Sequence, residues 1–175
     1  MSKTIQMKRI FFFALAAISF LNVCAQADKS QRPSPPAKAS ETTNNGVTIT
    51  IDYSQPALKS RTIGTDIAPY GEVWRTGANE ATVFEISKAA KVEGQALPAG
   101  KYGLYSIPGA NEWVIIFNKT WDQWGTRYQE ADDALRVKVK PATGQIFMER
   151  MTFEISKTGK VSLLWGAQQV DFNVQ

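Results

Sequence analysis

The 175-residue chain contains no histidine, and its only cysteine is Cys24. Catalytic triads and dyads that use histidine as the base are therefore excluded, as are zinc sites built from histidine or from several cysteines. A single cysteine also excludes a disulfide within the chain. Since no motif of a known enzyme class is present either, we predict no catalytic residue, no metal site and no cofactor.

The first 25 residues have the pattern of a signal peptide. A basic segment precedes the apolar run of residues 10–21, which is too short to cross a membrane as a permanent anchor. Small residues follow, and they predict cleavage before Gln26 or Asp28. We expect a periplasmic or secreted protein whose mature chain has no transmembrane segment. The alternative is a lipid anchor at Cys24.

The charge of the chain changes when the leader is removed. The full sequence has 20 basic and 16 acidic residues, and three of the basic residues lie in the leader. The mature chain is therefore almost neutral. A balance of this kind gives no support for nucleic acid or an anionic membrane as a partner, and we predict no nucleic-acid binding.

Residues 26–45 are rich in proline, serine and lysine and have no periodic apolar positions. Such composition is typical of a disordered linker, because little apolar surface is available to offset the entropy of ordering. We therefore predict signal peptide at 1–25, linker at 26–45 and one folded domain at 46–175.

Apolar and polar residues alternate in many short segments of the predicted domain, beginning with residues 47–53. Turn residues recur about every ten positions, and no segment has a helical period. Residues 113–117 are apolar at every position, which predicts a strand covered on both faces. Eight or nine short strands of this kind favour an all-β, antiparallel β-sandwich, with a β-barrel as the alternative.

One segment between two predicted strands, Tyr70-Gly-Glu-Val-Trp-Arg-Thr-Gly-Ala-Asn-Glu-Ala-Thr82, resembles the signature of a secreted bacterial family, domain of unknown function 2911. The segments at 59–61, 97–102, 113–118 and 123–125 are similar to other blocks of that family. The resemblance extends from Val47 to Val174. It implies the fold and the compartment, and it assigns no activity to any residue.

The same segment holds the first group of candidate ligand-binding residues. In the structural interpretation, Trp74 closes one end of the core, and Arg75 pairs with Glu80 or Glu72 to hold the chain in place. In the functional interpretation, the segment forms a polar pocket beside an aromatic surface, suited to a carboxylate or a sugar. The candidates are Tyr70, Trp74, Arg75, Asn79 and Glu80.

A second group of candidates lies on the long connection at residues 118–134, namely Trp121, Trp124 and Tyr128. Long connections in small domains are often functional, and aromatic rings stack well against the apolar faces of sugars. The structural alternative is that these rings cover the open end of the core.

The charged residues near the end of this connection point to structure rather than to a site. Glu130, Asp132 and Asp133 lack the spacing of a calcium-binding loop. The basic residues Arg136, Lys138 and Lys140 alternate on a predicted strand, and we expect them to face solvent or to pair with Glu149 and Glu154. Replacing Arg75 should thus destabilise the fold, whereas replacing Arg136 should matter little.

These observations favour an exported, non-catalytic β-sandwich that binds a glycan, a small molecule or another envelope protein. One alternative is a hydrolase that uses carboxylates without histidine, since 16 acidic residues are available. Another is a structural subunit that pairs through an exposed strand edge.

Overall fold

The computed structural model describes residues 28–175, so the predicted signal peptide lies outside the described residues. In this part of the chain no helix is long and apolar enough to cross a membrane. Residues 28–175 form ten strands and two short 3-10 turns, which are, in chain order, η1 (Lys29–Gln31), β1 (Pro36–Thr42), β2 (Thr48–Ser54), β3 (Thr82–Ile86), β4 (Ala90–Val92), β5 (Gln95–Leu97), β6 (Gly100–Ile107), β7 (Trp113–Asn118), η2 (Glu130–Asp132), β8 (Asp133–Val139), β9 (Pro141–Ile155) and β10 (Lys160–Asn173).

Six strands form an antiparallel sheet in the order β1-β2-β3-β6-β7-β8. On β2 the apolar side chains of Ile49 and Ile51 are fully buried, whereas Asp52 is exposed. This alternation places one face of the sheet against the core, as the period of two predicts. Short hairpin β4–β5 lies beside the sheet and is bridged to the end of the chain through Val92 and Val174.

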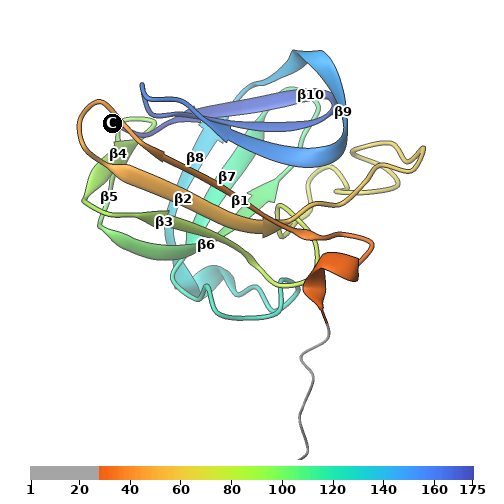
Figure 1. The fold of residues 1–175 in the computed structure, drawn as a ribbon, viewed down its shortest axis with the longest axis horizontal. Helices are drawn as coiled ribbons and strands as arrows, with labels where there is room; N and C mark the ends of the chain where they lie inside the picture. The colour runs from red at the N-terminus through yellow and green to blue at the C-terminus, as the bar shows by residue number, and fades with distance from the viewer. Residues whose placement is uncertain (1–27) are drawn as a thin grey trace, which may run out of the picture.

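The second layer is the long hairpin of β9 and β10, which lies across the core-facing side of the six-stranded sheet (Figure 1). Buried side chains of both strands fill the space between the layers, including Met151, Phe153, Leu163 and Trp165. The structure is an all-β sandwich without a closed barrel, which confirms the predicted fold class.

Strand β10 turns back on itself near its middle. The N–H of Val174, just after β10, donates to the carbonyl of Gly159, just before it, at 2.8 Å. A straight strand of 14 residues would separate these groups by more than 40 Å, so the strand must fold back. The bend falls at Gly166, which has a φ of 60° and interrupts the register with β9.

Strand β7 is buried on both faces, as its continuous apolar sequence predicts. Trp113, Ile115 and Phe117 point into the main core, and Ile116 points to the outer face of the sheet. There Ile116 packs in a second apolar cluster with Tyr105 and is fully buried. This outer cluster needs a cover, which the long connection between β7 and β8 supplies.

The prediction of a disordered linker at residues 26–45 is wrong for residues 36–42, which form β1. This strand pairs with β2 over seven positions, from Pro36 opposite Ser54 to Thr42 opposite Thr48. Its small residues are half-buried in alternation with exposed ones, and Lys38 pairs with Asp52 across the strands at 3.3 Å. Little apolar surface of β1 is buried, and the strand is held mainly by its backbone hydrogen bonds to the edge of β2. The folded domain therefore begins before residue 46.

Candidate functional site

The segment between β2 and β3 is anchored by Trp74. Its ring stacks on Trp165 with the ring centroids 5.2 Å apart and the planes inclined by 9°. The edge of Trp113 approaches the same ring, at 6.3 Å between centroids. The backbone of Trp74 exchanges two hydrogen bonds with Ser106 of β6, at 2.7 and 2.9 Å. Trp74 therefore closes one end of the core, as the structural interpretation predicts.

The chain leaves Trp74 in a series of tight turns. Thr76 and Asn79 have φ values of 46° and 61°, and Gly71 before them has 81°. Hydroxyl groups hold these turns, because Thr76 Oγ1 donates to Ser106 Oγ at 2.9 Å and Thr82 Oγ1 donates to the carbonyl of Thr76 at 2.8 Å. The backbone on either side of Arg75 is thus fixed to the sheet.

The predicted ion pair between Arg75 and Glu80 is wrong. Glu80 instead accepts hydrogen bonds from Arg32 at 2.8 and 3.0 Å and lies 3.0 Å from the ammonium group of Lys29. Burial acts to raise the pKa of Glu80, but its own backbone N–H and the two cations outweigh burial and lower the pKa to about 2. Both partners come from the segment predicted to be a disordered linker.

Glu72, the other predicted partner, forms no ion pair with any residue of 28–175. Within the same range the half-buried Arg75 makes neither an ion pair nor a side-chain hydrogen bond to a protein atom. Its guanidinium group is therefore without an acceptor in the described part of the chain.

Arg75 lines a cavity of about 360 Å³ on the outer side of the sheet. The lining residues are Val73, Trp74, Arg75, Tyr105, Gly125, Thr126 and Tyr128. The stem of Arg75 lies directly over Gly125, because a Cβ added to this glycine would overlap Cδ of Arg75. Burial raises the pKa of Tyr105, while the hydrogen bond from Gln123 and the positive charge of Arg75 act in the opposite direction.

One wall of the cavity is the ring of Tyr128, whose hydroxyl group is held from behind. It donates to Asp133 Oδ2 at 2.7 Å and accepts from Arg136 Nη2 at 2.7 Å. Burial and the hydrogen bond to Asp133 raise the pKa of Tyr128 to about 12. The ring is thereby fixed in one orientation, and its hydroxyl hydrogen is already donated to Asp133.

Arg136 does not pair with Glu149 or Glu154 as predicted. Its Nε donates to Asp133 at 2.7 Å, and Glu130 lies 3.1 Å from Nη2. The hydrogen bond to Asp133 raises the pKa of Arg136. The prediction failed because β8 pairs with β7 and not with β9, so the expected acids lie on the other layer.

The connection between β7 and β8 is held by hydrogen bonds at its base and at its tip. At its base Asn118, which is fully buried, donates to Asp133 at 2.8 Å and to the carbonyl of Gln129 at 2.9 Å. At its far end the N–H of Gly125 donates to the carbonyl of Asn79 at 3.1 Å. The connection therefore covers the outer cluster, and it joins the segment of Trp74 in forming the cavity.

The other predicted candidates lie outside this cavity. Tyr70 covers Gly64, Trp121 lies over the ammonium group of Lys101 at 5.0 Å, and Trp124 is 45% exposed. The side chain of Asn79 donates to the carbonyl of Ser34 at 3.1 Å. Of the eight predicted residues, the structure brings together Trp74, Arg75 and Tyr128.

Sequence reasoning missed four residues of the cavity: Val73, Tyr105, Gly125 and Thr126. For Tyr105 a signal was present, because its neighbour Leu104 faces the core and alternation turns Tyr105 to the outer face. For Gly125 no local signal existed, since its need for a small side chain arises from Arg75, 50 positions earlier.

Among residues 28–175, no three acidic, histidine or cysteine side chains gather as a metal ion would require. Asp132 accepts from Thr120 Oγ1 at 2.9 Å, and Asp133 is occupied by Arg136, Tyr128 and Asn118. Asp132 and Asp133 thus serve as hydrogen-bond acceptors for the protein itself.

Residues 34–174 match the model of a family described as protein of unknown function (DUF2911), and the chain belongs to this family. The match begins just before β1, in agreement with the place of that strand in the domain. No curated protein and no solved structure matches the chain.

Proposed function

We propose that this is an exported, non-catalytic binding protein whose Arg75 cavity holds a small molecule with a carboxylate group. The observation that carries the proposal is the missing acceptor of Arg75. Four other arginines donate to oxygen atoms of the protein: Arg32, Arg61, Arg136 and Arg150. Arg75 is half-buried beside a cavity and has no such partner within residues 28–175, so a ligand can supply it.

The chemistry of the cavity indicates the class of ligand. A guanidinium group is a planar fork of donors that matches a carboxylate. The partly buried ring of Tyr128, which packs against the buried Tyr105, offers apolar surface next to it. A volume of about 360 Å³ suits a molecule of roughly one ring. An aromatic acid and an acidic sugar both have this combination of a carboxylate and an apolar face.

Two acids near the cavity, Glu80 and Asp133, are engaged by other protein groups, which supports a binding role rather than acid–base catalysis. Glu80, whose backbone pairs with Trp124, is held by two cations. Asp133 accepts from three side chains, one of which is the cavity residue Tyr128. A general acid or base must be free to reach a substrate, and both carboxylates are already engaged.

Export is proposed from the leader alone. Mass spectrometry of the protein from envelope fractions should show a chain that starts at Gln26 or Asp28. An acylated Cys24 at the amino terminus would contradict cleavage at these positions.

The ligand class is tested by thermal shift with matched probes, because a molecule that binds only the folded state raises the melting temperature. Benzoate and glucuronate carry the carboxylate, and benzyl alcohol and glucose are their uncharged counterparts. We expect millimolar benzoate or glucuronate to stabilise the protein, and Arg75→Ala to abolish the effect. Arg127→Ala, at an exposed arginine outside the cavity lining, is the control and should leave the effect intact. Equal shifts from charged and uncharged probes would contradict the proposal.

A further inference from the structure

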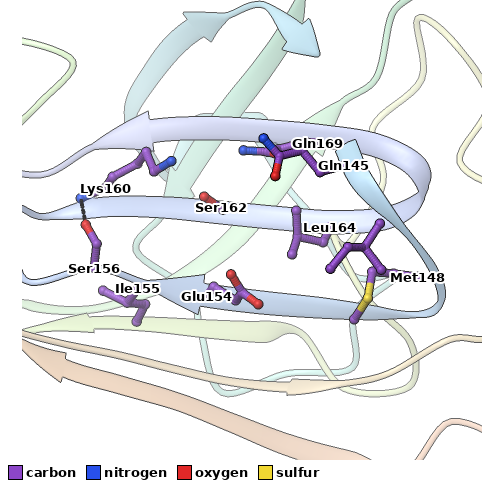
Figure 2. A pocket seen from close by; sticks show the side chains of 10 residues that line it. Gln145, Met148, Glu154, Ile155, Ser156, Lys160, Ser162, Leu164 and Gln169 are labelled. Atoms are coloured by element: carbon purple, nitrogen blue, oxygen red, sulfur yellow. Dashed lines mark hydrogen bonds between the residues drawn. The ribbon is translucent and has the colours of Figure 1, made fainter. Parts of the chain in front are cut away.

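A second cavity, of about 440 Å³, lies in the folded hairpin of β9 and β10, far from Arg75 in the sequence. Because β10 doubles back at Gly166, Gln169 on its second half lies alongside Ser162 and Leu164 on its first half (Figure 2). Glu154 and Met148 of β9 close the opposite side of the cavity. The fold of the hairpin thus creates a groove on the outer surface of the second layer.

Several apolar side chains of this groove are exposed to water. Ile146 is 73% exposed, and the partly buried side chains of Met148, Ile155 and Leu164 continue the apolar surface beside it. Between the pairs Gly166–Met148 and Gln168–Thr143, β9 has four residues where β10 has one, so Ile146 is carried outward on a wide bulge. An exposed apolar surface beside a cavity is typical of a binding site.

Polar groups of the groove can satisfy the backbone of an extended peptide. Gln145 supplies an amide donor and an acceptor, and Ser162, whose side chain is largely buried, supplies a hydroxyl group that makes no side-chain hydrogen bond within residues 28–175. Gln169 is engaged through its amide nitrogen with Asp171, which leaves its oxygen as an acceptor.

The charge of the groove is set by Glu154. This carboxylate forms no ion pair with any cation of residues 28–175, whereas the lysine in the lining, Lys160, lies 3.6 Å from Asp171. Glu154 is opposite Ser162 in the register, and Leu164 follows two positions later on the same face. The side chains of Glu154 and Leu164 are therefore about 7–8 Å apart. This separation matches the spacing of about 7 Å between alternate side chains of an extended peptide.

We propose that this groove binds an extended peptide segment that places a lysine or arginine next to aliphatic side chains on one face. No aromatic ring is found among the described residues that line the groove, which disfavours stacking with a sugar. Its lysine already has a carboxylate partner, which disfavours a phosphate or another anion. The site is distinct from the Arg75 cavity and does not depend on the function proposed for it.

The test uses two labelled heptapeptides with blocked ends, Thr-Leu-Thr-Lys-Thr-Leu-Thr and the same sequence with a central glutamate. Fluorescence anisotropy with the purified protein should show at least tenfold tighter binding of the lysine peptide. The variant Glu154→Gln should remove this preference, and Ile146→Ser should weaken binding of both peptides. The control Glu85→Gln alters an acid of the other layer that is paired with Lys101, and it should leave binding unchanged.

Three outcomes would overturn the proposal. The first is no binding of the lysine peptide at millimolar protein, and the second is an unchanged preference for lysine in Glu154→Gln. The third is self-association of the wild-type protein in sedimentation that Ile146→Ser abolishes, which would assign the groove to contacts between copies of the chain. Ile146 is largely exposed, so its substitution should leave the melting temperature within a few degrees and keep the result interpretable.

Discussion

Two arginines lie on either side of Tyr128, and they have opposite roles. Arg136 donates to the hydroxyl group of Tyr128 and to Asp133, whereas Arg75 shares a cavity with the ring and donates to no protein oxygen of residues 28–175. The side chain of Asp133 is only 11% exposed, so Arg136 neutralises a nearly buried charge. The comparison shows that the role of an arginine is decided by which carboxylate the fold brings within reach.

The difference has a local origin. Asp133 stands at the start of β8, directly after the 3-10 turn η2, and Arg136 follows three residues later on the same strand. Glu80, one of the two acids that were expected to pair with Arg75, is instead occupied by Lys29 and Arg32. Arg75 is thereby left to face the cavity.

The largest effect is expected for Arg136→Ala. It leaves Asp133 with its hydrogen bonds from Tyr128 and Asn118 but without a compensating cation, and hydrogen bonds to charged groups contribute roughly 1.5–3 kcal/mol. We expect the free energy of unfolding to fall by about 2 kcal/mol in urea titrations. The control Lys138→Ala removes an exposed pair with Glu112 and should cost less than about 1 kcal/mol. If both variants lost the same free energy of unfolding, the bond between Arg136 and Asp133 would contribute no more than an exposed ion pair.

A smaller effect is expected for Glu80→Gln, and it should depend on pH. The pKa of Glu80 in the folded protein is about 2, below its usual 4.5, so ionised Glu80 stabilises the fold above about pH 5. This contribution is lost as the pH falls from about 4.5 toward 2. Because the pair is partly exposed, we expect a difference of about 1 kcal/mol at pH 7 that shrinks through this range. Urea titrations of both proteins at several pH values measure it, and a difference independent of pH would show that the ion pairs do not stabilise the fold.

The smallest effect on stability is expected for Arg75→Ala, at less than about 1 kcal/mol. Only the packing of its stem on Gly125 is lost, since no protein acceptor within residues 28–175 is left unpaired. If Arg75→Ala lowered the free energy of unfolding as much as Arg136→Ala, Arg75 would have the structural role that the sequence predicted for it.

Much of the fold follows from the sequence, because burial on one face imposes a period of two. The alternation at residues 47–53 and the continuous apolar residues at 113–117 both predicted the burial that the structure shows. Strand β1 was missed because Ala37 and Ala39 are its only inward apolar residues, and they give little apolar signal among the surrounding prolines. It forms because the edge of β2 offers unpaired backbone groups.

The site was less predictable, and one error led to another. The composition of residues 26–45 predicts a linker, so the sequence offers Arg75, and not Lys29 or Arg32, as the partner of Glu80. The bond between Arg136 and Asp133 was missed for a different reason. It depends on the path of the chain through η2, and sequence spacing does not fix such a path.

The most direct test of this account is a titration of both arginines in one spectrum. The Nε–H resonances of Arg75 and Arg136 are assigned by NMR through the two alanine variants, and benzoate or glucuronate is then added to the wild-type protein. We predict that the Arg75 resonance shifts in a saturable manner while that of Arg136, already bonded to Asp133, stays in place. An Arg75 resonance that does not move, or equal shifts at both arginines, would contradict the assignment of Arg75 as the ligand-binding group.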